Sequence, residues 1–238
     1  MPSALAGQVA LITGGTRGIG LAIAKTFARH GMRIAICARR KEQLADAVRQ
    51  LEALDAEVLG VPADVTNAAE VEQFVNEALK RFGRLDVLVN NAGTGGYGPI
   101  DQTTEEDLQK VLDVNLRGVF LASRAVFPIM REKRRGYIIT ISSICGKEAY
   151  AEISAYCASK FASVGFTEAL LKEGIDSGIR TTSICPGMVD TEMVEGAGVP
   201  PEEMLKADDI AEACLFLLSL SEKAVVKEIV LQRAGAIE

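Results

Sequence analysis

Short apolar runs rich in Val and Ile alternate with longer amphipathic stretches along the chain. Seven runs are expected to form strands: Val9–Ile12, Arg33–Cys37, Val58–Val61, Val87–Val89, Tyr137–Ser142, Thr181–Ile184 and Glu228–Leu231. The stretches between them are expected to form helices: Ile19–Arg29, Glu42–Leu54, Ala68–Arg81, Glu105–Glu132, Ala155–Ser177 and Asp208–Leu218. Apolar strands separated by helices are typical of a parallel sheet covered on both faces. The pattern therefore predicts an α/β fold, doubly wound and Rossmann-type, with a seven-stranded parallel sheet flanked by helices.

No internal repeat and no Pro- or Ser-rich linker divides the chain, so residues 1–238 are interpreted as a single domain. One stretch, Met188–Lys206, interrupts the alternation with two glycines and the pair Pro200-Pro201. Excursions of this kind often cover a ligand site. We expect residues 188–206 to form a substrate flap within the domain.

Composition narrows the possible partners and location. Of the 238 residues, 48% are apolar and 24% are charged, and the net charge of −6 argues against nucleic acid as a main partner. No apolar stretch approaches the roughly 18 residues that a membrane span needs. The N-terminal residues Met1–Leu5 lack the charge and apolar core of a signal peptide. These features favour a cytoplasmic protein with no membrane partner.

The cysteines and the histidine argue against a disulfide framework or a metal centre. The five cysteines are scattered and form no Cys-x-x-Cys pair, which is typical of small buried side chains in a reducing compartment. The positions are Cys37, Cys145, Cys157, Cys185 and Cys214. His30 is the only histidine, so no His-based triad is available and no metal site is expected.

A glycine-rich turn follows the first expected strand and opens the first expected helix, with the sequence Thr13-Gly14-Gly15-Thr16-Arg17-Gly18-Ile19-Gly20. Glycines let a backbone approach a pyrophosphate, whose charge then faces the helix N-terminus. An ordinary turn would also use glycines, but this position between strand and helix favours a dinucleotide. The residues expected to contact it are Gly14, Thr16, Arg17, Gly18, Ile19 and Gly20.

The end of the second strand bears on which dinucleotide would bind. NAD-selective sites place an acidic residue there, whereas an arginine accommodates the 2′-phosphate of NADP. This chain has Arg39 and Arg40 and no acid, and Arg17 in the glycine turn is a second candidate for flanking the phosphate. The alternative is that Arg39 and Arg40 are the solvated start of a helix. We favour NADP(H).

A tyrosine and a lysine four residues apart, Tyr156 and Lys160, fall within one expected helix. Residues at this spacing are neighbours on a helix face, and a nearby cation is expected to lower the tyrosine pKa from about 10. Ser143, after an apolar strand, is placed to hydrogen-bond a substrate oxygen that Tyr156 protonates. Chance pairs on solvated helices and ordinary strand-end serines remain alternatives. Ser142 is another candidate, although strand alternation points it to the opposite face.

Taken together, these motifs and their order closely resemble the short-chain dehydrogenase/reductase family, and especially its 3-oxoacyl-[acyl-carrier-protein] reductases. Further matching segments are Asn90-Asn91-Ala92-Gly93 after the fourth strand, Asp64-Val65 after the third, Asn115, and Pro186-Gly187 with Val189 and Thr191. The resemblance implies that Asp64 and Val65 meet the adenine and that Asn91, Ala92 and Gly93 line the cofactor. It implies that the segment from Pro186 to Thr191 holds the nicotinamide.

The resemblance also implies a mechanism. Hydride passes between NADP(H) and a carbonyl or secondary alcohol, and Tyr156, Ser143, Lys160 and Asn115 form a proton relay. Lys160 would also bind the nicotinamide ribose, and Asn115 would hold a water that relays protons to Lys160. Epimerases and dehydratases share this scaffold but usually have longer chains. A non-catalytic NADP-sensing or scaffold protein on the same fold is an alternative from another class.

The sequence does not define one substrate: the resemblance implies a 3-oxoacyl thioester or another small ketone, and sugars, polyols, β-hydroxy acids and quinone-like ketones are alternatives. Tyr97, Cys145–Ile153 and Met188–Lys206 are expected to line the substrate pocket, and Glu148 and Glu152 are expected to be solvated. A 3-oxoacyl thioester on an acidic carrier would need a basic patch, for which the run Arg131–Arg135 is a candidate. Family members often end in a Val-Asp-Gly-Gly-like segment that packs between subunits, whereas this chain continues Leu231-Gln232-Arg233-Ala234-Gly235. A homodimer through the long helices is therefore expected before a tetramer.

Overall fold

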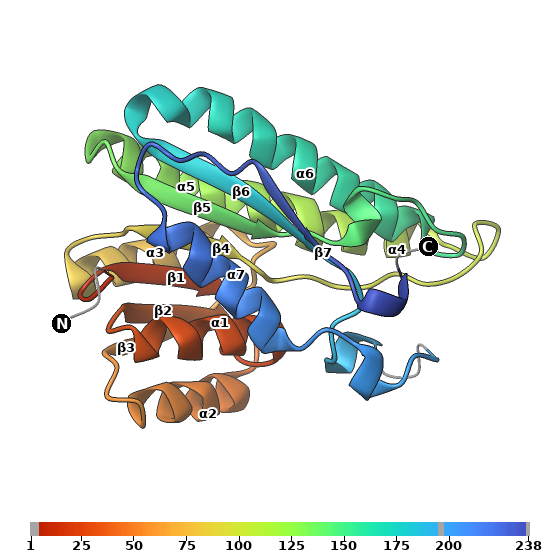
Figure 1. Ribbon diagram of the computed structural model, residues 1–238, viewed down its shortest axis with the longest axis horizontal. Helices are drawn as coiled ribbons and strands as arrows, with labels where there is room; N and C mark the ends of the chain where they lie inside the picture. The colour runs from red at the N-terminus through yellow and green to blue at the C-terminus, as the bar shows by residue number, and fades with distance from the viewer. Residues whose placement is uncertain (1–4, 195–197, 237–238) are drawn as a thin grey trace.

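The computed structural model describes residues 5–194 and 198–236. Its strands are β1 (Val9–Thr13), β2 (Arg33–Ala38), β3 (Val58–Pro62), β4 (Val87–Asn90), β5 (Gly136–Ile141), β6 (Ile179–Pro186) and β7 (Glu228–Leu231). Its α-helices are α1 (Gly18–Arg29), α2 (Lys41–Glu52), α3 (Ala68–Phe82), α4 (Glu105–Leu112), α5 (Gly118–Glu132), α6 (Ser154–Gly174) and α7 (Ala207–Ser219). The strands form one parallel sheet in the order β3-β2-β1-β4-β5-β6-β7, which confirms the predicted fold (Figure 1).

Two apolar layers hold helices against the two faces of the sheet. Along β1, Ala10 and Ile12 face the cluster that contains α1, α2 and α7, while Val9 and Leu11 face the cluster that contains α3, α5 and α6. Successive residues of a strand point to opposite faces, so a strand buried on both sides is apolar at most positions. All five cysteines are free and buried. Within the described ranges, no helix is long and apolar enough to cross a membrane.

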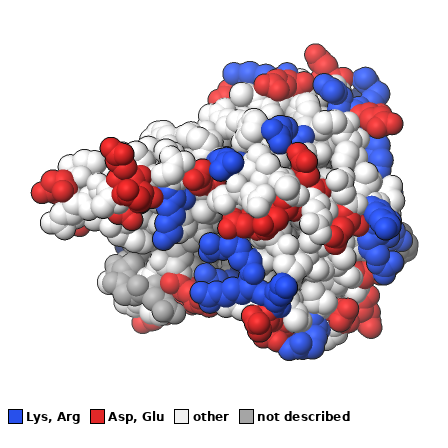
Figure 2. All heavy atoms as spheres, turned by 180° about the vertical axis from the view of Figure 1, so that it is seen from behind, with Lys and Arg blue, Asp and Glu red and all other residues white. Residues whose placement is uncertain are grey.

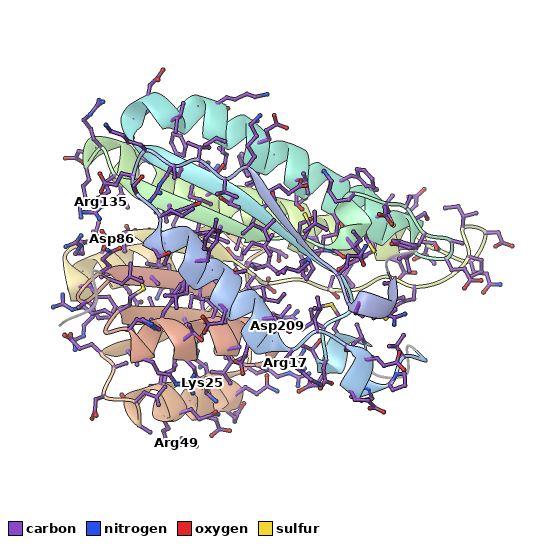
Figure 3. The ribbon with its side chains drawn as sticks, in the orientation of Figure 1. Arg17, Lys25, Arg49, Asp86, Arg135 and Asp209 are labelled. Atoms are coloured by element: carbon purple, nitrogen blue, oxygen red, sulfur yellow. The ribbon has the colours of Figure 1, made fainter. Side chains whose placement is uncertain are left out.

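The amino ends of the strands are tied by a buried carboxylate. Asp86, which directly precedes β4, accepts a hydrogen bond from Val9 N at 2.8 Å and from Arg84 Nε at 2.8 Å (Figure 3). The carboxyl ends of the strands lie at the opposite end of the sheet. From β1 the chain adds β2 and β3 on one side, and from β4 it adds β5, β6 and β7 on the other, so the strand order reverses between β1 and β4. A crevice for ligands forms at such a reversal in doubly wound sheets.

The predicted helix Glu105–Glu132 is three elements rather than one, so that prediction is wrong in detail. A π-helical turn, Asp113–Arg117, separates α4 from α5. A π turn inserts one extra residue into a helix and leaves the flanking apolar pattern nearly unchanged, so periodicity alone does not reveal it. Such turns are frequent at functional sites, and this one carries Asn115.

Residues 188–206, which we call the strap, are anchored at both ends. Val189 pairs with Leu205 in an isolated parallel bridge, and Asp190 N donates to Leu205 O at 2.8 Å. Lys206 Nζ also reaches Asp190 Oδ2 at 3.1 Å. The strap contains two short 3-10 turns, Glu192–Val194 and Pro201–Glu203, and its residues 195–197 lie outside the described ranges. The first and last residues of the strap are therefore bound to each other.

Candidate active site

A cavity of about 830 Å³ opens at the carboxyl edge of the sheet. The residues that the sequence nominated and that line it are Gly14, Thr16, Arg17, Gly18, Ile19, Arg39, Arg40, Asp64, Val65, Asn91, Ala92, Gly93, Ser143, Tyr156, Lys160, Pro186, Gly187, Val189 and Thr191. Gly20 and Asn115 were also nominated, but they lie behind the lining. Seven separate segments of the chain thus meet around one cavity.

The glycine turn is shaped for close approach of a ligand. Gly14 and Gly18 have φ values of +65° and +49°, which favour glycine. A Cβ on Gly14 would lie 3.0 Å from Ala92 Cα, so the turn packs directly on the segment after β4. No side chain caps the N-terminus of α1. Its first N–H groups are therefore available to an anion at the cavity wall.

Gly20 does not line the cavity, but it packs against Gly14 of the turn and against Asn91. A Cβ on Gly20 would lie 2.4 Å from Asn91 Nδ2 and 2.4 Å from Gly14 O. Asn91 Nδ2 donates to the carbonyl oxygens of Thr13 and Gly14, both at 3.0 Å. Gly20 thus lets α1 approach closely enough for Asn91 to hold the turn.

Replacing Gly20 with alanine is expected to destabilise the protein by about 1–3 kcal/mol, because the new methyl group overlaps a backbone oxygen and the Asn91 amide. Thermal unfolding measures the effect. Gln50→Ala, at an exposed position of α2, is the control and should change the free energy of unfolding by about 0.5 kcal/mol or less. Equal stability of the two variants would contradict the close packing at Gly20.

Arginines rim one end of the cavity. Figure 2 shows Lys and Arg side chains gathered around a hollow on the face seen from behind. Arg39 and Arg40 are exposed and, within the described part of the chain, their guanidinium groups have no ion-pair partner. Arg17 instead pairs with Glu192 of the strap, and both side chains are mostly exposed. An anion at this end would find Arg39 and Arg40 unpaired, and it would compete with Glu192 for Arg17.

Asp64 combines a local turn with a place in the cavity wall. Its Oδ1 accepts hydrogen bonds from Thr66 N at 2.9 Å and Thr66 Oγ1 at 2.8 Å. This is a local turn at the end of β3, and the residue also lines the cavity beside Val65. The two roles are compatible because only one carboxylate oxygen is used in the turn.

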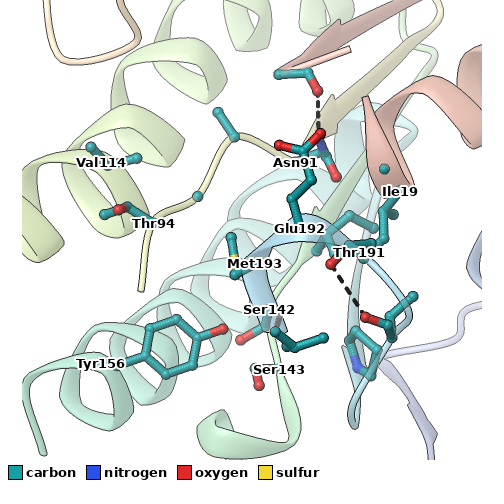
Figure 4. Close-up of a pocket in the computed structure, with 18 of the residues that line it drawn as sticks. Ile19, Asn91, Thr94, Val114, Ser142, Ser143, Tyr156, Thr191, Glu192 and Met193 are labelled. Atoms are coloured by element: carbon teal, nitrogen blue, oxygen red, sulfur yellow. Dashed lines mark hydrogen bonds between the residues drawn. The ribbon is translucent and has the colours of Figure 1, made fainter. Parts of the chain in front are cut away.

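Ser143 faces Tyr156, whereas Ser142 does not. The hydroxyl of Tyr156 points toward the end of β5, where Ser143 lies (Figure 4), and Ser143 acts to lower the pKa of Tyr156. Ser142 Oγ donates to Lys160 O at 3.2 Å and lies 3.0 Å from Ser163 Oγ. Strand alternation therefore separates the two serines as expected, and Ser142 serves to fix α6 against β5.

The pKa values of Tyr156 and Lys160 are set mainly by burial. Burial raises the pKa of Tyr156, and the hydrogen bond from Ser143 opposes that rise. Burial lowers the pKa of Lys160 from 10.5 to about 8. The expectation that Lys160 lowers the tyrosine pKa is not met: Lys160 Nζ lies 5.5 Å from the ring centre and donates to Ile141 O at 3.2 Å. Desolvation of the phenol outweighs the cation, so Tyr156 holds its proton at neutral pH.

Asn115 is buried, and both Oδ1 and Nδ2 of its side chain make hydrogen bonds. Its Oδ1 accepts from Thr94 N at 2.8 Å, and its Nδ2 donates to Thr94 O at 2.9 Å and to Ser159 Oγ at 3.0 Å. A Cβ on Gly93 would lie 3.5 Å from Asn115 Oδ1 and 3.8 Å from Lys160 Nζ. The missing side chain of Gly93 therefore leaves a small space between these two polar atoms.

Sequence reasoning missed the tail after β7. Gln232, Arg233 and Ala236 line the cavity, and so does Lys110 of α4. The departure at Gln232-Arg233-Ala234 was interpreted as a matter of subunit packing, although a charged residue in place of a glycine was itself a signal. Tyr97, Cys145, Tyr150, Ile153 and six strap residues line the cavity as expected, whereas Glu148 and Glu152 are exposed and outside the lining.

Comparison with known proteins defines the family. The family model described as short chain dehydrogenase matches residues 8–199. A putative ketoacyl reductase of the granaticin polyketide synthase of Streptomyces violaceoruber is 41% identical over 196 residues, covering 82% of this chain and 72% of that one. A 3-oxoacyl-[acyl-carrier-protein] reductase of Synechocystis is 38% identical over 200 residues, covering 84% and 81%. The chain belongs to the short-chain dehydrogenase/reductase family, and it is similar to the 3-oxoacyl-[acyl-carrier-protein] reductases within it.

Solved structures agree with this assignment. Levodione reductase superposes with a TM-score of 0.92 at 32% identity, covering 98% of this chain and 99% of that one. An alcohol dehydrogenase of Thermococcus sibiricus complexed with 5-hydroxy-NADP gives 0.89 at 33%, covering 95% and 97%. A metagenomic short-chain oxidoreductase in complex with NADP gives 0.86 at 31%, covering 98% and 99%.

Proposed function

We propose that the protein is an NADP(H)-dependent oxidoreductase that interconverts a carbonyl group and a secondary alcohol. We base this on one observation: Tyr156, Ser143 and Lys160 line the same cavity as the glycine turn. Arg39 and Arg40, which have no ion-pair partner among the described residues, line its other end. A dinucleotide needs such an anion-binding end and a reactive end. The non-catalytic sensor considered from the sequence would not require the buried proton-transfer group at the second end.

The residues of the cavity fit NADP(H). The glycine turn and the uncapped N-terminus of α1 suit a pyrophosphate, and Arg39 and Arg40 suit a 2′-phosphate. Two related structures contain NADP or a derivative of it, which supports the same choice here. Pro186, Gly187 and Thr191 at the end of β6 would hold the nicotinamide. When bound, the cofactor supplies or accepts the hydride.

Ser143 and Tyr156 both act on the substrate oxygen, Ser143 as a hydrogen-bond donor and Tyr156 as a proton donor. In the reduction direction, Ser143 donates a hydrogen bond that polarises and positions the carbonyl oxygen. Tyr156 gives its phenolic proton to that oxygen as the carbon is reduced. The raised pKa of Tyr156 keeps this proton in place at neutral pH, so the residue is in the correct state for reduction.

Lys160 and Asn115 return the proton to Tyr156. Lys160 would hold the cofactor ribose and carry charge next to the phenolate that forms. Within the part of the chain that the structure describes, one lone pair of Asn115 Oδ1 has no partner, whereas Nδ2 and the other lone pair do. A water in the space beside Gly93 would connect Asn115 with Lys160 and complete the relay.

The proposed substrate is a carbonyl compound of the class that related enzymes reduce, and the proposed assembly is a homodimer. The relatives support a 3-oxoacyl thioester or another small ketone. Within the basic run expected to dock a carrier protein, Lys133, Arg134 and Arg135 contact Gly83 O, Asp176 O and Glu222, so most of its cations have partners within the chain. We expect a homodimer through α4, α5 and α6, whose exposed apolar side chains are Leu108, Phe120 and Phe161.

Replacing Arg39 with aspartate tests the cofactor assignment. The wild-type protein should bind NADPH more tightly than NADH, and the variant should lose roughly 10- to 100-fold in NADPH affinity because a charge-assisted contact is removed. Nicotinamide fluorescence measures both affinities. Arg49→Asp, on the same side of the sheet but paired with Asp46 and outside the cavity, is the matched control and should leave them unchanged. Equal binding of both cofactors by the wild type would contradict the NADP assignment.

A further inference from the structure

The tail after β7 places a cation in the cavity wall. Arg233 is one residue beyond Gln232, and only 24% of its side chain is exposed. Gly187 N donates to Leu231 O at 2.7 Å, and Gln232 Oε1 would lie 3.2 Å from a Cβ on Gly187. The tail thus runs against the end of β6, and Figure 1 shows it beside the strap.

Arg233 belongs to the catalytic end of the cavity. β7 is five strands from β2, where Arg39 lies, and only two strands from β5, where Ser143 follows. At about 4.8 Å per strand these separations are about 24 Å and about 10 Å. The guanidinium group of Arg233 is therefore too far from Arg39 to share the 2′-phosphate. It is near enough to meet a substrate held at Ser143 and Tyr156.

Charge at this end of the cavity is predominantly positive. The charged lining residues beyond β4 that the structure describes are Lys110, Lys160, Arg233 and Glu192, and Glu192 is paired with Arg17. Among the described residues, the side chain of Arg233 forms one ion pair, from Nη1 to Glu203 at 3.4 Å, and Glu203 is 57% exposed and outside the lining. Within the described ranges, Nε and Nη2 of Arg233 have no partner. A guanidinium group with free donors suits a carboxylate, which it can bind through two parallel hydrogen bonds.

We propose that Arg233 binds a carboxylate of the substrate, so that the preferred substrate is a small oxo acid or the corresponding hydroxy acid. This inference rests on the proposed oxidoreductase function and narrows its substrate class. Tyr156 and Ser143 act on the carbonyl oxygen, and Arg233 fixes the other end of the molecule. Arg233 is a specificity-determining residue in this scheme, because it selects a charged group without taking part in proton or hydride transfer.

Matched acids and esters test the proposal. The probes are 3-oxobutanoate, 4-oxopentanoate and their methyl esters, which differ in charge and in the spacing of carbonyl and carboxylate. Binding to the NADPH complex is measured by calorimetry, and turnover is measured by NADPH consumption. At least one acid should bind about tenfold or more tightly than its ester. Arg233→Gln should remove this preference and leave the ester unchanged.

Glu203→Gln separates carboxylate binding from a purely structural ion pair. This variant breaks the Arg233–Glu203 contact but keeps the guanidinium group, so the preference for the acid should persist. The proposal is overturned if no acid binds more tightly than its ester, if both variants lose the preference equally, or if Arg233→Gln weakens acid and ester alike. Arg233→Lys provides a second variant that retains charge, and partial recovery of the preference is expected. Failure of the proposed function is distinct: acids would bind with the expected preference, yet no probe would be reduced.

Discussion

Replacing Tyr156 with phenylalanine is expected to lower kcat for carbonyl reduction by about a thousand-fold. The variant keeps the ring, which is partly buried and packs with Ile144, Cys145 and Cys157, so the fold and the NADPH affinity should change little. The only loss is the hydroxyl that Ser143 contacts and that delivers the proton. Steady-state kinetics and nicotinamide fluorescence on the same preparation separate the two effects.

Tyr137→Phe is the matched control, because it removes a hydroxyl from a second buried tyrosine, which lies in β5 and not in the cavity wall. Tyr137 lies at the start of β5, and its hydroxyl is 2.8 Å from Thr182 Oγ1, away from the cavity. This variant should lose some stability and keep its kcat. If Tyr156→Phe retained activity within a few-fold of wild type, or if both variants lost activity equally, Tyr156 would not be the proton donor.

The direction of the Tyr156 pKa shift also fixes the pH dependence. Because burial raises the pKa of Tyr156, the phenol stays protonated through neutral pH. Reduction needs the phenol and should be nearly level between about pH 6 and 8, whereas alcohol oxidation needs the phenolate and should rise with pH. Initial rates in both directions measure this difference. A fall in the oxidation rate with rising pH would contradict the assignment of Tyr156 as the proton-transfer group.

Replacing Lys160 with methionine is expected to lower kcat strongly and at the same time to stabilise the protein. Lys160 is 6% exposed, and burial lowers its pKa from 10.5 to about 8, so folding at neutral pH includes the cost of burying a charge. Each pKa unit corresponds to about 1.4 kcal/mol, which gives a gain of up to about 3 kcal/mol at pH 7. The relay loses its cation, and kcat should fall by about a hundred-fold or more.

The stability gain should depend on pH with a definite sign. The cost of the buried lysine is fully present below its folded pKa of about 8, and it shrinks as the pH rises from there toward the unfolded value of 10.5. The Tm difference between Lys160→Met and wild type should therefore be largest near pH 7 and smaller near pH 10. Lys172→Met, on the exposed side of the same helix, is the control and should change Tm little. A variant less stable than wild type at pH 7 would contradict this account of Lys160.

Much of the fold was accessible from sequence because the strands are buried on both faces. The central strands are rich in Val, Ile, Leu and Ala for this reason, although β6 also buries Thr181, Thr182 and Ser183. All seven strands were predicted within one or two residues at either end. The gathering of the nominated residues around one cavity follows for a similar reason: in a parallel sheet, the segments after the strands all meet at the same edge. Gly14, Asp64, Asn91 and Ser143 each follow a strand in this way.

Other features depend on three-dimensional surroundings that no local pattern records. The π turn at Asp113–Arg117 adds a single residue and leaves the helical pattern nearly intact. The pKa of Tyr156 depends on how completely the phenol is desolvated, and the i+4 spacing to Lys160 indicates only that a cation is near. Arg233 follows the last strand at the far side of the sheet, and its place in the cavity depends on how the tail packs against Gly187.

Transfer of hydride from the cofactor to a carbonyl carbon defines the proposed reaction, and isotope labelling follows this transfer atom by atom. The protein is incubated with NADPH carrying deuterium at both C4 positions and with the oxo acids and esters above. Mass spectrometry then locates the label in the alcohol product. We expect the wild type to form an alcohol with one deuterium on the former carbonyl carbon, and Tyr156→Phe to form this product about a thousand-fold more slowly. An alcohol without deuterium, or label transfer that persists in Tyr156→Phe at the wild-type rate, would contradict it.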